Sequence, residues 1–315
     1  MSATPQAIII SEPMAKQNAT WSDAISILEE TLKSGFNPEG DPMRSRLDTF
    51  TGEFFLMPSW TNKYVGLKVL TSTPANQARR MPLIYGTYNL FNAEFGYPLA
   101  YIDGGAITNL RTASLSTMVI KKALRKNENE LVVFGSGNQG RLHILAISSV
   151  TKITKLTVVD VFPDRCEALA KEMREFIPEV LVGDASAVKT ADIIVCCSTS
   201  STPLFSGRDV QDHVIVVAMG VYTPDKRETD GELCKKAFVV VESMKTSMAE
   251  AGDLILAINE GNLKKEDIHT ISSVICGNVA IPPTGPVFFK STGMAWEDLV
   301  VAGKIYEKVR DAQPK

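Results

Sequence analysis

A glycine-rich segment offers the clearest chemistry in this sequence. Residues 131–140 read Leu-Val-Val-Phe-Gly-Ser-Gly-Asn-Gln-Gly, so a G-x-G-x-x-G pattern follows directly after an apolar run. Glycines at this spacing permit a tight turn, close approach of the backbone to a pyrophosphate, and packing of a helix on a strand. The helix behind such a turn presents free N–H groups to phosphate oxygens. The pattern predicts a dinucleotide site with contacts from Gly135, Ser136, Gly137, Asn138, Gln139 and Gly140.

An acidic residue follows at the spacing that such sites use for the adenosine ribose. Asp160 ends the next apolar run, 20 residues after Gly140. Its carboxylate can accept hydrogen bonds from both ribose hydroxyls and repels a 2′-phosphate, which favours NAD(H) over NADP(H). Arg165 lies nearby and could serve a 2′-phosphate instead, so NADP(H) stays open as the alternative cofactor.

Two more segments end apolar runs in the same part of the chain. Ser198 and Thr199 follow the run at 192–197, and Gly220 follows the run at 214–219. In an open α/β sheet the ligand lies at the carboxyl ends of the strands. We therefore expect these residues to face the nicotinamide end of the cofactor, with ordinary turn chemistry as the alternative.

The elements that must position these residues alternate between strand and helix from about residue 127 onward. This alternation predicts an α/β fold with a Rossmann-type, doubly wound parallel sheet. The expected strands are 131–134, 156–160, 179–182, 192–197, 214–219 and 237–242, and the expected helices are 138–149, 163–176, 184–190 and 243–259.

The first third of the chain has a different pattern. A capping box at 20–23 predicts a helix, and four strand-like runs separated by Gly, Pro and Asn indicate an antiparallel sheet. A final helix has no strand after it and can return to this first part. We expect a discontinuous α+β domain at 1–118 plus 290–315 and a dinucleotide-binding domain at 119–289. The runs are 53–57, 64–70, 84–91 and 98–102, and the further helices are about 108–124 and 295–311.

Composition limits the partners and the compartment. Lys and Arg number 33 against 36 Asp and Glu, a net charge of −3, which argues against nucleic acid as a partner. No apolar run approaches the roughly 18 residues of a membrane helix, and the N-terminus lacks a signal-peptide pattern. The 5 cysteines include no Cys-x-x-Cys, which predicts buried thiols in a reducing cytoplasm. No histidine has a second ligand at metal spacing, so no metal site is expected.

Several segments resemble the ornithine cyclodeaminase/mu-crystallin family, and Leu-Arg-Thr-Ala at 110–113 followed by the glycine motif is quite specific. The resemblance implies a Rossmann domain, a substrate and dimerisation domain, and a homodimer. The family includes cyclodeaminases, alanine dehydrogenase-like enzymes, cyclic-imine reductases and the binding protein mu-crystallin. The segments are 62–68, 96–100, 110–114, the glycine motif through His143, 250–254 and 289–298.

The resemblance also implies roles for single residues. Arg111 matches the arginine that grips the substrate carboxylate beside the nicotinamide, a task suited to a planar guanidinium. Lys68 matches the lysine of the substrate pocket, although the alternation of its strand alone would indicate a solvent-facing lysine. Arg44 matches a second carboxylate-binding arginine, with Arg46 as the alternative register. Ser291 lies in the loop that approaches the nicotinamide.

Tyr222 stands where the cyclodeaminases carry an aspartate that takes part in proton transfer. A phenol provides no carboxylate at neutral pH, because its reference pKa is about 10. This departure favours a reductase that uses NADH to convert Δ1-pyrroline-2-carboxylate or Δ1-piperideine-2-carboxylate to proline or pipecolate. Solvent, Lys68 and Tyr222 stay open as the proton source, and Tyr222 is alternatively a pocket wall.

Three other functions remain as alternatives. They are an ornithine cyclodeaminase that releases ammonia with catalytic NAD, an open-chain amino-acid dehydrogenase such as alanine dehydrogenase, and a mu-crystallin-like binding protein. In each case we expect a small imino or amino acid as the partner, a cytoplasmic homodimer, and neither nucleic acid nor membrane.

Overall fold

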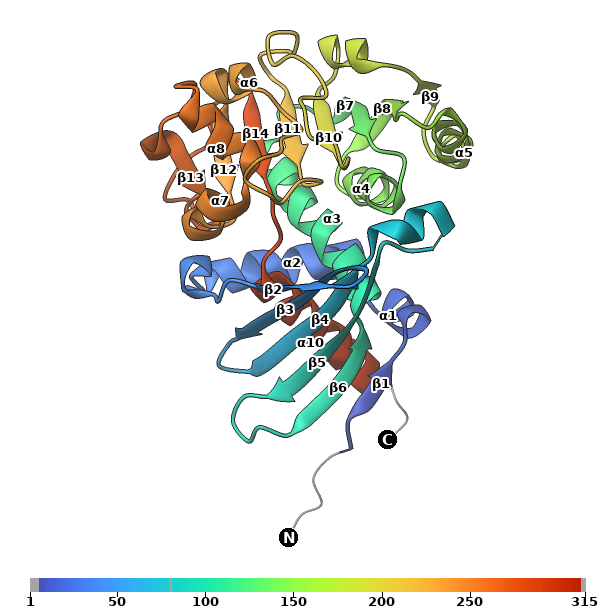
Figure 1. The fold of residues 1–315 in the computed structure, drawn as a ribbon, viewed down its shortest axis with the longest axis vertical. Helices are drawn as coiled ribbons and strands as arrows, with labels where there is room; N and C mark the ends of the chain where they lie inside the picture. Colours follow the sequence, from blue (N-terminus) through green and yellow to red (C-terminus); the bar gives the residue numbers. More distant parts are fainter. Residues whose placement is uncertain (1–5, 80, 313–315) are drawn as a thin grey trace. The chain divides into compact units, whose positions relative to one another are not determined.

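The computed structural model describes residues 6–79 and 81–312, and it divides the chain into two compact units (Figure 1). Unit 1 consists of Met1–Leu115 and Met294–Lys315, and unit 2 consists of Ser116–Gly293. None of the described helices is both long enough and apolar enough to cross a membrane.

Unit 1 is built on a six-stranded sheet in the order β1-β6-β5-β4-β3-β2. Strands β2 to β6 are antiparallel, as predicted, and β1 joins β6 in parallel. The four central strands were predicted from the sequence, whereas β1 and β2 were not. The strands are β1 (Ile8–Ile10), β2 (Ser45–Thr49), β3 (Gly52–Trp60), β4 (Tyr64–Ser72), β5 (Ile84–Asn92) and β6 (Pro98–Asp103).

Helices of unit 1 cover one face of this sheet. The capping box at Thr20 is confirmed, because its hydroxyl accepts from the amide of Asp23 and the Asp23 carboxylate accepts from the amide of Thr20. Helix α10 packs on β3, β4 and α2, and Figure 1 shows it along the sheet. The elements are α1 (Glu12–Asn18), α2 (Trp21–Lys33), α10 (Ala295–Asp311) and the 3₁₀ turns η1 (Pro38–Gly40) and η2 (Pro74–Arg79).

Helix α3 (Gly104–Ala123) begins four residues earlier than the predicted start at 108. Its residues up to Leu115 belong to unit 1 and the remainder to unit 2. Arg111 and Thr108 therefore belong to unit 1, together with the antiparallel sheet.

Unit 2 contains an eight-stranded sheet in the order β13-β12-β14-β11-β10-β7-β8-β9, and every strand pair in it is parallel. The order in which the chain adds strands to this sheet reverses between β7 and β10. Doubly wound sheets bind their ligands in the crevice at such a switch point. The predicted α/β fold class is confirmed. The strands are β7 (Glu128–Phe134), β8 (Lys152–Val159), β9 (Glu179–Val182), β10 (Ile193–Cys196), β11 (Ile215–Ala218), β12 (Phe238–Val241), β13 (Ile268–Thr270) and β14 (Val287–Lys290).

Two helix predictions in unit 2 were wrong in detail. The segment at 184–190 forms only a 3₁₀ turn, η3 (Ala185–Lys189), and the long helix expected at 243–259 is two helices that break at Ala251. Strands β13 and β14, of three and four residues, were not predicted. The helices are α4 (Asn138–Ser148), α5 (Pro163–Met173), α6 (Gly231–Lys236), α7 (Met244–Glu250), α8 (Gly252–Asn259) and α9 (Ile271–Ile275), with η4 at Lys265–Asp267.

Candidate active site

Lys68 lies on the covered face of the unit 1 sheet and is 1% exposed. The predicted alternation along β4 is confirmed, but the solvent-facing orientation that it suggested is wrong, because the even-numbered residues of β4 are the buried ones. Residues directly opposite one another in antiparallel strands share a face. Lys68 is paired with Met57 on one side and with Tyr88 on the other, so the three side chains form one row across the sheet.

Two carboxylates of α10 meet the two predicted substrate cations. Asp298 Oδ2 lies 2.6 Å from the Lys68 ammonium, and Asp298 Oδ1 lies 3.3 Å from Nε of Arg111. Glu297 Oε2 accepts a hydrogen bond of 2.7 Å from Nη1 of Arg111. All four groups are at most 9% exposed, so unit 1 brings Lys68 and Arg111 together in a dry, charge-balanced cluster.

Burial changes the titration of this cluster. Desolvation, together with the positive charge of Arg111, lowers the pKa of Lys68 to about 8 against the attraction of Asp298. Tyr88 is fully buried, its hydroxyl has no hydrogen-bond partner among the described residues, and burial raises its pKa well above the ordinary value. Tyr88 therefore stays neutral, whereas Lys68 can exchange a proton near neutral pH.

The two candidate arginines near β2, Arg44 and Arg46, have different partners. Arg46 is half-exposed and pairs with Glu53 on the adjacent strand. Arg44 precedes β2 by one residue, and its guanidinium carbon lies 5.9 Å from the ring centre of Phe55. Ser45 pairs with Leu56, so extending the register by one residue puts Arg44 opposite Met57, in the row of Lys68. Arg46 is opposite Phe55, so both arginines lie on the same face of β2, and they differ in their partners: Arg44 approaches the Phe55 ring, whereas Arg46 pairs with Glu53.

The glycine-rich turn of unit 2 joins β7 to α4. Gly135 has φ of +108°, and a Cβ atom there would meet the carbonyl oxygen of Cys197 at 2.6 Å. A Cβ atom on Gly140 would lie 1.9 Å from the carbonyl oxygen of Gly135, so these two glycines are required by the protein itself. Gly137, the N-cap of α4, has nothing within 4 Å of the position that a Cβ atom would take, so its backbone faces open space. That opening fits a pyrophosphate at the helix N-terminus.

Asp160 follows β8, as predicted, and is held against the glycine turn. Its Oδ2 atom accepts from the amide of Ser136 at 2.6 Å and from the hydroxyl of Ser136 at 2.7 Å, while Oδ1 accepts from the amide of Phe162 at 3.2 Å. The carboxylate is half-buried. It is therefore fixed at the edge where the ribose of a dinucleotide would lie.

The loops after β10 and β11 are joined by a residue that sequence analysis did not select. Oε1 of Glu228 accepts from the amide of Ser198 at 2.7 Å and from its hydroxyl at 2.8 Å, and Oε2 accepts from the amide of Gly220 at 2.7 Å. Glu228 is fully buried, and desolvation raises its pKa. Ser198 and Gly220 are thus brought together, whereas Thr199 is exposed and Tyr222 is half-buried in the following loop.

A second buried carboxylate, Asp253, supports Glu228. Asp253 Oδ1 accepts from the amides of Glu228 and Thr229, both at 2.8 Å, and Oδ2 lies 2.8 Å from the Lys290 ammonium. Asp253 and Lys290 are fully buried. Because a buried charge is tolerated only when it is paired and hydrogen-bonded, this pair fixes the loops at the carboxyl edge of the sheet.

Ser291 is held by a third buried carboxylate, Glu242, which follows β12. The Ser291 hydroxyl donates to Oε1 of Glu242 at 2.7 Å, and the amides of Thr292 and Gly293 donate to the same carboxylate at 2.8 and 3.1 Å. Ser291 is 2% exposed. Its hydroxyl is therefore part of the support of this loop.

Neither the histidine next to the glycine motif nor any other described group forms a metal site. His143 is fully buried on α4, between the carbonyl of Gln139 at 2.8 Å and the hydroxyl of Ser116 at 3.0 Å, as expected of a packing residue. Within residues 6–79 and 81–312, no cluster of His, Cys, Asp and Glu has the makeup of a metal site.

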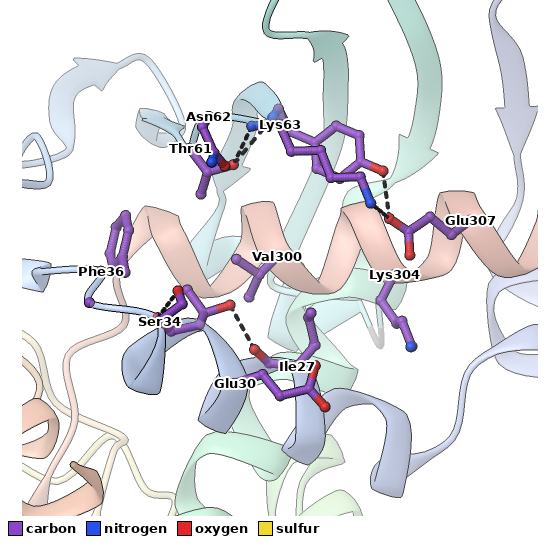
Figure 2. Close-up of a pocket in the computed structure, with 13 residues that line it drawn as sticks. Ile27, Glu30, Ser34, Phe36, Thr61, Asn62, Lys63, Val300, Lys304 and Glu307 are labelled. Carbon is purple, nitrogen blue, oxygen red and sulfur yellow. Dashed lines mark hydrogen bonds and ion pairs between the residues drawn. The ribbon is translucent and has the colours of Figure 1, made fainter.

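Figure 2 shows a hollow of about 520 Å³ in unit 1 that none of the predicted site residues lines. It lies among α2, α10 and the turn between β3 and β4, and Glu307 in its wall accepts from Lys63 and from the hydroxyl of Tyr64. Burial raises the pKa of this tyrosine hydroxyl far above its usual range. The hollow is thus separate from the cluster of Lys68 and Arg111.

Comparison with known proteins agrees with this arrangement. A sequence profile of the ornithine cyclodeaminase/mu-crystallin family matches residues 14–313. The chain belongs to this family. The resemblance stated from its motifs is confirmed.

Relatives with named activities are similar to this chain over nearly its whole length. The Δ1-pyrroline-2-carboxylate reductase of Colwellia psychrerythraea is 29% identical over 314 residues, which cover 96% of this chain and 99% of that protein. The structure of the Thermococcus litoralis Δ1-pyrroline-2-carboxylate reductase in complex with NADH and L-proline superposes with a TM-score of 0.91 at 26% identity, covering 96% of this chain and 98% of that one. An archaeal alanine dehydrogenase dimer with bound NAD has a TM-score of 0.89 at 26% identity, covering 97% and 96%.

Proposed function

We propose that this protein is an NADH-dependent reductase of cyclic 2-imino acids, which converts Δ1-pyrroline-2-carboxylate to proline or Δ1-piperideine-2-carboxylate to pipecolate. The buried cluster of Lys68, Arg111 and Asp298 carries the proposal, because it holds two cations for a small anionic substrate in a dry site. The relatives named Δ1-pyrroline-2-carboxylate reductase support this substrate class.

Unit 2 supplies the residues that would hold the cofactor. The open space at Gly137 and the N-terminus of α4 fit a pyrophosphate, and Asp160 fits the ribose hydroxyls of NAD(H) while disfavouring a 2′-phosphate. We assign Gly135 to Gly140 and Asp160 to the adenosine and pyrophosphate half. Ser198, Thr199, Gly220 and Ser291 are assigned to the nicotinamide half, on the loops that Glu228 and Glu242 support.

Unit 1 supplies the residues that would hold the substrate. Arg111 and Arg44 offer planar guanidinium groups to the substrate carboxylate, and a bidentate pair fixes both its position and its orientation. Orientation matters because a reductase gains most of its rate from holding the imine carbon in line with the hydride donor.

The reaction adds two hydrogens across the C=N bond. NADH supplies the hydride for the imine carbon when it is bound. The imine nitrogen takes up a proton, so that imine, NADH and one proton yield the amine and NAD⁺. We assign the proton to Lys68, because a lysine with a pKa of about 8 is close to the ideal for a general acid near neutral pH. Tyr222 is assigned to the wall of the substrate pocket.

The test is a spectrophotometric assay of the purified protein with NADH and freshly prepared Δ1-pyrroline-2-carboxylate or Δ1-piperideine-2-carboxylate. We expect absorbance at 340 nm to fall without added ammonia, and proline or pipecolate to accumulate in equal amount. Arg111→Ala should abolish the signal, whereas Arg208→Ala, at an exposed ion pair with Glu232, should keep it. Absence of turnover with both imines would refute the proposal.

The same preparation separates the alternatives. An ornithine cyclodeaminase would release ammonia from ornithine with NAD, and Tyr222 in place of a carboxylate argues against this outcome. An alanine dehydrogenase would oxidise NADH with pyruvate only when ammonia is added. Activity in either assay, without activity on the cyclic imines, would replace the proposed reaction by that one.

We further propose that the protein is a homodimer formed through the open face of the unit 1 sheet. This face carries exposed apolar side chains, and contiguous apolar surface of this kind marks association sites. Tyr101→Glu should shift the species seen by light scattering from dimer to monomer, whereas Phe176→Glu on unit 2 should not. The exposed side chains are Ile9, Leu47, Trp60, Val65, Tyr85 and Tyr101.

A further inference from the structure

Glu297 and Asp298 are adjacent in the first turn of α10, both are fully buried, and each faces a cation of the candidate site. We infer that Asp298 is a positioning residue of the reductase, which acts on the reaction by holding the Lys68 ammonium in place, and that Glu297 positions Arg111. The inference rests on the proposed function, in which Lys68 and Arg111 meet the substrate.

The contacts of the Lys68 ammonium leave one of its N–H donors for the substrate. Asp298 Oδ2 lies 2.6 Å from its nitrogen, and the hydroxyl oxygen of Thr108 accepts from it at 3.4 Å. The Thr108 hydroxyl donates its own proton to the carbonyl of Gly104 at 2.8 Å, so toward Lys68 it can only accept. An ammonium group has three N–H donors. Within the described part of the chain two of them have acceptors, so the third is the donor available to a bound imine.

The contacts of Glu297 are equally directional. Its Oε1 atom accepts from the amide of Met294 at 3.1 Å, which fixes the carboxylate at the start of its own helix. Its Oε2 atom then faces Nη1 of Arg111 at 2.7 Å. The positive end of the α10 dipole stabilises both carboxylates at this position. The helix start thus orients Lys68 through Asp298, and Arg111 through Glu297 together with the second oxygen of Asp298.

Charge balance is kept during the proposed proton transfer. Two carboxylates oppose two cations in the buried cluster, and an imino acid with an ionised carboxyl group and an unprotonated nitrogen carries one negative charge. When Lys68 donates its proton to the imine nitrogen, the substrate becomes neutral and so does Lys68, so the net charge of the dry site does not change. Neutralising Asp298 would leave Lys68 as a buried cation without its nearest counter-ion, which favours loss of its proton.

The groups that face Lys68 come from three elements. They are Asp298 and Glu297 from α10, Arg111 from α3 and Tyr88 from β5. Asp41, which accepts from the amide of Trp296, acts on Tyr88 instead. Burial and Arg111 lower the pKa of Lys68, and Asp298 opposes them more strongly than Glu297 does. Replacing Asp298 by an amide must therefore lower the pKa of Lys68 more than replacing Glu297.

The experiment compares two isosteric variants of neighbouring residues, Asp298→Asn and Glu297→Gln, across a pH series with NADH and Δ1-pyrroline-2-carboxylate. For Asp298→Asn we expect the alkaline limb of kcat/KM to move down by about one pH unit or more, with a lower kcat at pH 7.5. For Glu297→Gln we expect a rise in KM of about tenfold with a smaller shift of that limb. Asp298→Glu, which keeps the charge, should retain the wild-type limb.

Each outcome decides a separate question. No turnover by the wild-type enzyme would refute the proposed function and leave the positioning roles to a direct titration. That titration follows the ¹³Cε shift of Lys68 in lysine-labelled full-length protein, assigned with Lys68→Arg, and needs no activity. An active wild-type enzyme whose alkaline limb and Lys68 titration do not change in Asp298→Asn would overturn the inference, since a purely structural carboxylate would lower stability without moving either.

Discussion

The amide nitrogen and the hydroxyl of Ser136 both donate to Oδ2 of Asp160, at 2.6 and 2.7 Å. The second residue of the glycine turn thereby fixes the carboxylate that we assign to the ribose. Asp160→Asn keeps the shape but removes the negative charge that repels a 2′-phosphate. We expect the preference for NADH over NADPH, measured as the ratio of kcat/KM values, to fall at least about tenfold. Asp164→Asn, at an exposed position on α5, is the matched control and should leave the ratio unchanged.

Alanine substitutions at Gly137 and Gly140 should have different effects, one on NADH binding and the other on folding. Gly137 has φ of −80° and open space around a Cβ position, so Gly137→Ala should change the free energy of unfolding of the apo protein by less than about 1 kcal/mol. It should still raise the dissociation constant of NADH at least about tenfold, because the methyl group occupies the space of the pyrophosphate. Gly140→Ala should instead unfold the domain, since its Cβ would lie 1.9 Å from the Gly135 oxygen. Calorimetry and NADH fluorescence titration measure both quantities.

Replacing Arg111 by lysine, which keeps only the positive charge, should weaken substrate binding. Arg111→Lys retains a cation but loses the planar fork that meets Glu297 and Asp298 on one side and a carboxylate on the other. We expect KM for the imino acid to rise about 10- to 100-fold, with KM for NADH changed less than threefold. Equal increases in both KM values would point to a general disturbance of the fold.

Lys68 predicts the pH dependence of the reduction. Its pKa of about 8 means that the ammonium loses its proton as the pH rises through 8, so kcat/KM should be full below that value and fall above it. Lys68→Met should lower kcat by at least about 100-fold and remove this limb. A limb that persists in Lys68→Met would assign the proton to another donor.

Replacing the buried carboxylate of Glu242 should lower the stability of the protein. In Glu242→Gln an amide NH₂ replaces either Oε1, which accepts from Ser291 and Gly293, or Oε2, which accepts from Thr292 and Gly293. We expect the free energy of unfolding to fall by about 2–3 kcal/mol, seen as a Tm lower by roughly 5 °C or more. Glu232→Gln, at an exposed ion pair with Arg208, should shift the Tm by less than about 2 °C.

The sequence predicted those features whose causes are local. The glycine pattern indicated the turn after β7, the spacing to Asp160 indicated an acidic residue at the end of the next strand, and the helix predicted at 295–311 is α10 with both ends correct. Each of these depends on residues close together in the chain or on a motif with fixed geometry.

The buried carboxylates were not predicted, because their partners are distant in sequence. Asp298 meets Lys68, Glu242 meets Ser291, and Glu228 meets Ser198, and no periodicity relates such pairs. One signal was present: Glu242 and Lys290 each follow directly on a short apolar run, where an ionisable group enters the core with a partner. Strand β14, which ends at Lys290, was missed along with that signal.

Strand β14 lies between β11 and β12 although it is the last strand in the chain, and α10, which packs on β3 and β4, follows it. A ribosome that has made residues 1–280 has therefore produced a unit 2 sheet with a gap near its middle and a unit 1 sheet without its covering helix. Neither core can close until β14 and α10 have emerged from the exit tunnel. Both units must therefore wait for residues 287–311 to complete their folding, and a chain truncated before β14 should be a substrate for chaperones and proteases.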